Sequence, residues 1–223
     1  MSAEPHASIA EIEHRLADVT ERVRAAGGDH VRIVGVTKRH PVELLVAAVA
    51  AGVVDLGENY AQEFAAKRSE VTGAHWHFIG QLQTNKVRLV LSADGPDDAA
   101  VTIQSVDRNS LVDAIARIGP GTDVFIQMDL SGVAGRGGAA PDEVESLVER
   151  AVDRGLVVRG LMAVAPLDAG ESEVARGFAS VRRRCDELGL GEASMGMSED
   201  FELAVAEGST MIRIGSALFG MRS

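Results

Sequence analysis

The chain has 223 residues, of which 46% are hydrophobic, so it is long enough for one well-packed core of the size of a compact single-domain barrel. Its formal net charge of -11 argues against nucleic acid or an anionic membrane surface as a partner, because both would repel it. The single cysteine, Cys185, excludes an internal disulfide and suits a reducing compartment.

The sequence shows no targeting or membrane-spanning segment. The N-terminal residues include Glu4, Glu11 and Glu13 and lack the basic and apolar regions of a secretory signal. The longest uncharged apolar run, 44–54, is too short to span a bilayer. We therefore expect a cytoplasmic protein that does not bind membranes.

Short apolar runs alternate with amphipathic stretches along the whole chain. Apolar residues at helical spacing predict a leading helix from Ser8 to about Ala26. The predicted strands after it are 31–37, 53–56, 75–79, 101–105, 123–128, 156–164, 193–195 and 211–214. The predicted helices that follow these strands are 41–51, 60–70, 84–91, 109–118, 141–154, 172–188, 198–207 and a closing turn from 216.

Eight strands, each followed by a helix or a helical turn, predict an α/β fold, a single (β/α)8 barrel of the TIM type. We expect residues 1–223 to form one domain, with residues 1–27 as a leading helix packed on the barrel. The strands 53–56 and 193–195 are short, so a doubly wound open sheet with fewer strands is the alternative. Residues 92–100 and 131–140 are rich in Gly, Ala and Asp and predict loops.

Lys38 follows the first predicted strand, VRIVGVT, whose run of apolar residues is typical of a strand buried on both faces. In TIM barrels the loops at the carboxyl ends of the strands carry the chemistry. A primary amine at that rim can be partly desolvated, which favours the neutral form that attacks a carbonyl to give an imine. A solvated lysine at the end of a strand is the simpler alternative.

Other polar residues also follow predicted strands. Ser198 precedes one predicted helix, and Gly215 and Ser216 precede the closing turn. Unpaired N–H groups and the positive dipole end at helix starts favour phosphate binding there. Ser198 could equally be an ordinary N-cap, and the acidic residues Glu199 and Asp200 beside it would weaken anion binding unless they point away.

Arg213 lies inside the apolar strand MIRIG, and a buried guanidinium needs a partner. That partner could be a ring nitrogen of a bound ligand or a carboxylate such as Glu58. His75 and His77 share one face of a strand, which permits a metal pair, but the sequence shows no third ligand and we predict no metal site. Lys86 is either a phosphate neighbour or, as we favour, a solvated lysine.

An imine-forming amine, a phosphate cradle and an arginine together have the layout of a pyridoxal 5′-phosphate (PLP) site. The segments VTK, GENYAQE, HWHFIGQLQTNK, GLMAVAP, SMGMSED and IRIGSALFG resemble the signature blocks of the pyridoxal phosphate homeostasis proteins, the YggS/PLPBP (proline synthetase co-transcribed) family. The blocks extend from Val31 to Gly220. The resemblance implies a fold type III barrel related to the N-terminal domain of alanine racemase, without the C-terminal β-domain.

The resemblance also implies roles for individual residues, none of them catalytic. Lys38 would hold PLP as an internal aldimine and Arg213 would face its pyridine nitrogen. The phosphate would lie among Ser198, Gly215 and Ser216, and the ring pocket would be lined by Asn59, His77 and Met162. One loop departs from the family pattern: Arg136, Gly137 and Gly138 stand where lysine-x-glycine is usual, so we assign that loop no role.

We expect a PLP-binding protein that acts in intracellular PLP homeostasis without strong catalysis, which is also what the resemblance implies. A ring nitrogen that faces arginine stays unprotonated, so the ring is a poor electron sink. Racemisation needs two bases, and the related racemases take the second, a tyrosine, from an added β-domain of a partner subunit. The only tyrosine here, Tyr60, begins a predicted helix.

Two other functions use the same amine. One is a PLP-dependent racemase or decarboxylase of low activity. The other is a class I aldolase, although in those barrels the imine lysine usually lies on a later strand. For the homeostasis protein, PLP-dependent apoenzymes are the candidate partners, and we expect a monomer because no active site has to be shared.

Overall fold

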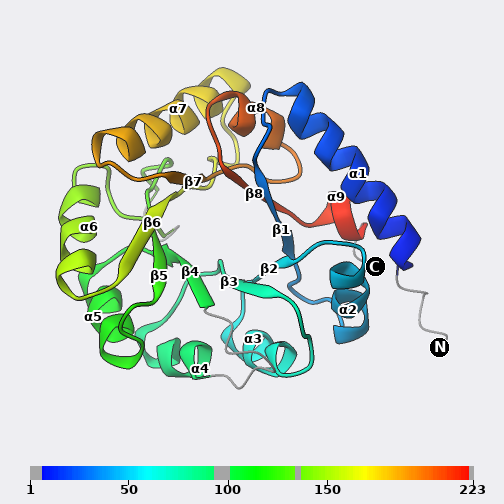
Figure 1. The fold of residues 1–223 in the computed structure, drawn as a ribbon. Coiled ribbons are helices and arrows are strands. Elements are labelled where there is room, and N and C mark those ends of the chain that lie inside the picture. The colour runs from blue at the N-terminus through cyan, green and yellow to red at the C-terminus, as the bar shows by residue number, and fades with distance from the viewer. Residues whose placement is uncertain (1–6, 93–100, 134–136, 221–223) are drawn as a thin grey trace.

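The computed structural model describes residues 7–92, 101–133 and 137–220. Eight strands form a closed barrel. Figure 1 shows them arranged around a central axis, with the helices outside them. All strand pairs are parallel and follow chain order, and β1 pairs with β8 from Arg32 opposite Met211 to Gly35 opposite Ile214. The predicted (β/α)8 barrel is therefore confirmed, and the open doubly wound sheet is wrong because the first and last strands are hydrogen-bonded neighbours.

The elements lie close to their predicted positions. The strands are β1 Arg32–Val36, β2 Asp55–Glu58, β3 His75–Phe78, β4 Val101–Val106, β5 Asp123–Gln127, β6 Val157–Met162, β7 Glu192–Ser194 and β8 Met211–Ile214. The helices are α1 Ile9–Ala25, α2 Val42–Ala50, α3 Ala61–Arg68, the 3-10 turn η1 Thr84–Lys86, α4 Val87–Leu91, α5 Asn109–Ile118, α6 Val144–Asp153, α7 Glu171–Glu187, α8 Phe201–Ala206 and α9 Ser216–Phe219.

Two separate apolar clusters hold the fold together. The large cluster lies between the barrel strands and the surrounding helices, and its bulkiest buried side chains include Trp76, Phe64 and Phe178. The small cluster consists of Val34, Phe125, Met162 and Met211 on β1, β5, β6 and β8. Several buried polar side chains also come from the strands, among them Glu58, His77, Gln104, Ser194 and Arg213. The barrel strands therefore carry buried hydrogen-bonding side chains in addition to apolar ones.

Helix α1 precedes the first strand and packs against α2, α8 and α9 (Figure 1). It begins with a capping box in which Ser8 and Glu11 each accept from the other's backbone N–H, and it buries Ile12, Val19 and Val23. This packing supports our proposal that the whole chain forms one domain. Among the described residues, no helix is both long enough and apolar enough to cross a membrane.

Gly160 provides a test of barrel closure between β6 and β7. Its register partner is Glu192, and a Cβ added at Gly160 would lie 1.8 Å from the Glu192 carbonyl oxygen. We expect Gly160→Ala to lower the free energy of unfolding by about 3 kcal/mol or more, because rigid backbone must separate to admit the methyl group. Urea denaturation measures this loss.

Gly191→Ala is the matched control for this substitution. Gly191 precedes β7, and a Cβ there would meet no atom within 4 Å. We expect a change within about 0.5 kcal/mol. Equal effects of the two substitutions would contradict the close strand contact.

Candidate functional site

A cavity of about 670 Å³ lies at the carboxyl ends of the barrel strands. Its walls come from the segments that follow β1, β6, β7 and β8 and from the first turns of α7 and α8. The lining residues are Val36, Lys38, Ala165, Pro166, Leu167, Ala169, Glu171, Val174, Met197, Ser198, Glu199, Asp200, Glu202, Leu203, Arg213, Gly215 and Ser216. The volume falls within the range of about 300–1,000 Å³ usual for small-molecule sites.

Most of the predicted site residues come together in this cavity. They are Lys38, Ser198, Arg213, Gly215 and Ser216. They come from three separate parts of the chain, which the barrel closure of β8 on β1 brings side by side. That these residues bind a ligand is a prediction.

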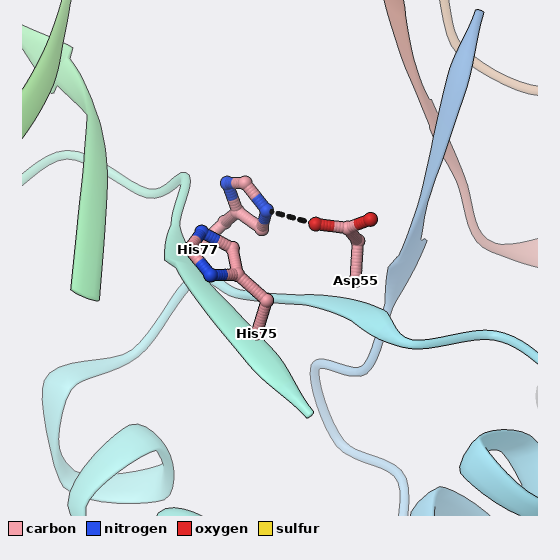
Figure 2. Close-up of side chains that lie close together, drawn as sticks. All are labelled: Asp55, His75 and His77. Carbon is pink, nitrogen blue, oxygen red and sulfur yellow. Dashed lines mark hydrogen bonds and ion pairs between the residues drawn. The ribbon is translucent and has the colours of Figure 1, made fainter. Parts of the chain in front are cut away.

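His77, which was predicted to line the ring pocket, lies outside this cavity. It is fully buried, and its Nε2 lies 2.8 Å from Oδ1 of Asp55, the first residue of β2 (Figure 2). Because Asp55 is at the amino end of its strand, this hydrogen bond directs the imidazole away from the carboxyl rim. His77 is not among the residues that line the cavity.

Asn59 and Met162 also lie outside the cavity lining. Met162 ends β6 and packs in the small cluster with Phe125. Asn59 follows β2, and its Oδ1 is buried without a hydrogen-bond partner. Its backbone is wedged against the next loop, since a Cβ on Gly80 would lie 2.1 Å from the Asn59 carbonyl oxygen. Asn59 thus has a buried acceptor that no donor among the described residues satisfies, at the carboxyl end of β2.

The backbone around Lys38 is fixed by the side chain of Lys67. Lys67 Nζ donates to the carbonyl oxygen of Thr37 at 2.9 Å, to Glu58 Oε2 at 2.8 Å and to Glu63 Oε2 at 2.6 Å. Glu63 Oε2 also accepts the backbone N–H of Arg39 at 2.7 Å. Both neighbours of Lys38 are therefore tied to the same buried charge cluster.

Arg39 adopts a left-handed backbone conformation with φ of 62°. Residues other than glycine rarely take this conformation, which costs about 1–3 kcal/mol and persists where the surroundings enforce it. The backbone bond from His40 N–H to the Thr37 carbonyl, at 3.0 Å, closes the turn. The strand therefore ends abruptly, and half-buried Lys38 reaches the cavity from a tight turn.

Arg213 is buried, and its guanidinium is held by neutral oxygens. One terminal nitrogen donates to the carbonyl and the hydroxyl of Ser194, both at 2.7 Å, and the other donates to the carbonyl of Ala163 at 2.7 Å. Burial lowers the pKa of Arg213 to about 10, an effect that the charge of Asp200 opposes. The pairing with Glu58 considered from the sequence is wrong, because Glu58 is paired with Lys67.

A chain of hydrogen bonds through buried side chains continues from Arg213 toward the opposite rim. Ser194 Oγ donates to Gln104 Oε1 at 2.7 Å, and Gln104 Nε2 lies 2.9 Å from His77 Nδ1. His77 Nε2 is in turn hydrogen-bonded to Asp55 Oδ1. These residues lie on β8, β7, β4, β3 and β2, so the orientation of Arg213 depends on most of the barrel.

Ser198 is not an N-cap, because α8 begins later than the sequence predicted. The Met197 N–H donates to Asp200 Oδ1 at 2.5 Å, and the Asp200 N–H donates to the Met197 carbonyl at 3.1 Å. This turn leaves Ser198 in its middle, and Asp200 becomes the residue before the helix. Burial raises the pKa of Asp200, against the opposing effect of the Met197 N–H and of Arg213.

The sequence did not single out the segment after β6 as part of the site. Ala165, Pro166 and Leu167 line the cavity, and the first two end the GLMAVAP segment, in which only Met162 had been given a role. Lys86 lies on η1 and does not line the cavity. Arg136 falls outside the described residues.

The alanine racemase N-terminal domain family matches residues 8–223 of the chain. A pyridoxal phosphate homeostasis protein of Deinococcus radiodurans is 40% identical over 203 residues, covering 88% of this chain and 91% of that protein. Its Escherichia coli K12 counterpart is 34% identical over 236 residues, covering 95% and 97%. The chain belongs to the pyridoxal phosphate homeostasis family. The predicted family resemblance is confirmed.

Two solved structures have folds similar to that of this chain, at different levels of sequence identity. PipY of Synechococcus elongatus PCC7942, solved with PLP bound, is 33% identical with a TM-score of 0.80, covering 94% of this chain and 100% of PipY. Alanine racemase of Corynebacterium glutamicum is only 15% identical, with a TM-score of 0.74, covering 96% of this chain and 62% of the racemase. That second likeness shows a shared fold alone.

The cluster beneath Lys38 gives a stability prediction. Lys67→Met leaves Glu58 buried without its cation, and we expect it to cost about 3–5 kcal/mol of unfolding free energy. Lys86→Met, the same substitution on η1, should change stability by no more than about 0.5 kcal/mol. Urea denaturation of both variants tests this, and equal losses would contradict the central place of Lys67.

Proposed function

We propose that the chain binds pyridoxal 5′-phosphate in the carboxyl-rim cavity and acts in PLP homeostasis without strong catalysis. Lys38 and Arg213 on the walls of one cavity, in a chain of this family, are the observation that carries the proposal. PipY, solved with PLP bound and 33% identical, supports it. When bound, the cofactor supplies an aldehyde carbon that reacts with a primary amine.

The residues present fit such a ligand. Lys38 brings its primary amine to the cavity from a turn that Lys67 and Glu63 hold in place. Arg213 brings a buried positive charge whose partners are neutral oxygens, so its charge is not cancelled by a contacting carboxylate within the described residues. The unpaired Oδ1 of Asn59 lies near the same rim.

Anion binding in this cavity depends on donors rather than on net charge. Glu171, Glu199, Asp200 and Glu202 also line the cavity, and together they would repel a phosphate. Burial raises the pKa of Asp200 and thereby disfavours its charged form. We assign the hydroxyls of Ser198 and Ser216 and the backbone of Gly215 as the groups that donate to the phosphate oxygens.

The same residues limit catalysis. With a pKa of about 10, Arg213 keeps its proton at neutral pH, and a ring nitrogen placed against it stays unprotonated. Tyr60, the only tyrosine in the sequence, is 44% exposed and its ring lies 6.0 Å from the guanidinium carbon of Arg39, outside the cavity lining. A tyrosine base like that of the racemases is therefore not part of this proposal.

We further propose that the chain delivers PLP to apoenzymes and that it is a monomer. Leu167 is 78% exposed and Met197 37% exposed, and both line the cavity, so a partner that approaches the rim would meet apolar side chains. Sedimentation of the purified protein tests the monomer.

Reduction with borohydride followed by peptide mass spectrometry tests the site. The sequence contains three lysines, Lys38, Lys67 and Lys86, so the position of a cofactor adduct is unambiguous. We expect one adduct, on the peptide that contains Lys38, its loss in Lys38→Ala and its retention in Lys86→Ala. An adduct on Lys67 or Lys86 would overturn the site.

Catalysis is tested separately. PLP-loaded protein is incubated with a panel of amino acids in deuterium oxide, and α-deuterium uptake is compared with that caused by free PLP. We expect no excess over free PLP. Rapid uptake that depends on the protein would favour a racemase or decarboxylase, while leaving the binding site intact.

A further inference from the structure

Three potential metal ligands meet at the amino ends of β2 and β3, on the rim opposite to Lys38. Asp55 is the first residue of β2, His75 is the first residue of β3, and the two are register partners. His77 lies two residues further along the same face of β3. Figure 2 shows both imidazoles rising from β3 and the Asp55 carboxylate directed at His77. Asp55 is the third potential ligand, which the sequence did not reveal.

The donor atoms of the cluster are close enough for one ion. One ligand atom from each residue lies within 4.8 Å of the others, and the two imidazole rings have their centroids 4.6 Å apart. Ligand atoms around a tetrahedral zinc ion are about 3.3 Å apart, given bond lengths near 2.0 Å. Small side-chain rotations therefore bring the three donors to a common ion.

Side chains of the next strand hold both rings. Thr102 Oγ1 lies 3.0 Å from His75 Nε2, and Gln104 Nε2 lies 2.9 Å from His77 Nδ1. Such neighbours orient the imidazoles in metal sites and are as much a part of them as the ligands. In the structure the Gln104 nitrogen faces His77 while its oxygen accepts from Ser194 Oγ, so the other tautomer of His77 requires the amide to turn over.

The charges in the cluster suit a divalent cation. His75 and His77 offer ring nitrogens and Asp55 offers a carboxylate oxygen to such an ion. The nearby Arg32 is itself paired with Glu192, which reduces its repulsion of a cation.

We propose that Asp55, His75 and His77 bind one divalent transition-metal ion, with zinc as the best match for two imidazoles and a carboxylate. Two histidines and one carboxylate leave the fourth tetrahedral position to water. The ion takes the place of the proton between His77 Nε2 and Asp55 Oδ1, and that proton moves to Nδ1. The Gln104 amide turns over at the same time, so that its oxygen accepts the proton and its nitrogen faces Ser194 Oγ. An ion in this place joins β2 to β3 at the rim of a TIM barrel that serves stability rather than chemistry.

Calorimetric titration of tag-free, chelator-treated protein with zinc chloride at pH 7.5 tests the site. We expect one ion per chain with a Kd in the micromolar range or below, and a rise in Tm at saturating zinc, because an ion that binds only the folded chain stabilises it. Asp55→Asn, which is close to isosteric, and His75→Asn should each weaken binding at least about tenfold, since even loss of a residue that supports a ligand costs that much.

Two control variants locate the ion. His14 forms a surface pair with Asp18 on α1, with 3.7 Å between them, so His14→Asn removes a histidine beside an aspartate elsewhere and should leave zinc affinity unchanged. Lys38→Ala should also leave it unchanged, which separates this site from the PLP cavity. Cooperative thermal unfolding checks that each variant is folded.

The proposal is overturned if the wild-type chain binds zinc only at millimolar concentrations. It is equally overturned if folded Asp55→Asn and His75→Asn chains retain wild-type affinity, since the ion would then lie elsewhere.

Discussion

The ammonium group of Lys67, sealed among Glu58, Glu63 and the carbonyl of Thr37, fixes the geometry on which the cavity depends. A buried lysine is tolerated only when carboxylates and carbonyls satisfy it, and here its acceptors come from the segment after β1, from β2 and from α3. The same cluster binds the N–H of Arg39 and so secures the left-handed turn that carries Lys38. Lys67 thus has a structural role: it holds the turn from which Lys38 reaches the cavity.

Polar groups among the barrel strands complete the arrangement. A continuous chain of hydrogen bonds from Asp55 to Arg213 occupies positions that an ordinary barrel would fill with Val, Ile or Leu. Its cost in desolvation is acceptable because nearly every member is paired. The result is a guanidinium whose orientation is set before any ligand arrives, and no carboxylate within the described part of the chain contacts it. Preorganisation of this kind lowers the cost of binding.

The sequence predicted the fold well because its signals are local. The helix 109–118 and the strand 211–214 have the predicted bounds, and the alternation of strand and helix was enough to indicate a closed barrel. The site was only partly predictable. Spacing along the chain placed Lys38 and Arg213, but it could not tell that His77 turns toward Asp55, because the two residues are joined only by the register of β2 and β3. The N-cap position that the sequence left open for Ser198 is taken by Asp200, because the Met197–Asp200 turn depends on a side-chain hydrogen bond that spacing along the chain does not reveal.

The most direct test of the account is a titration of the purified protein with PLP, followed by visible absorption, in the wild-type chain and in Lys38→Ala. If Lys38 holds PLP, the wild-type chain saturates at one equivalent with a visible band, and the variant loses that band. A protein that stays colourless with excess PLP, or a variant with the same band and the same saturation, would contradict it.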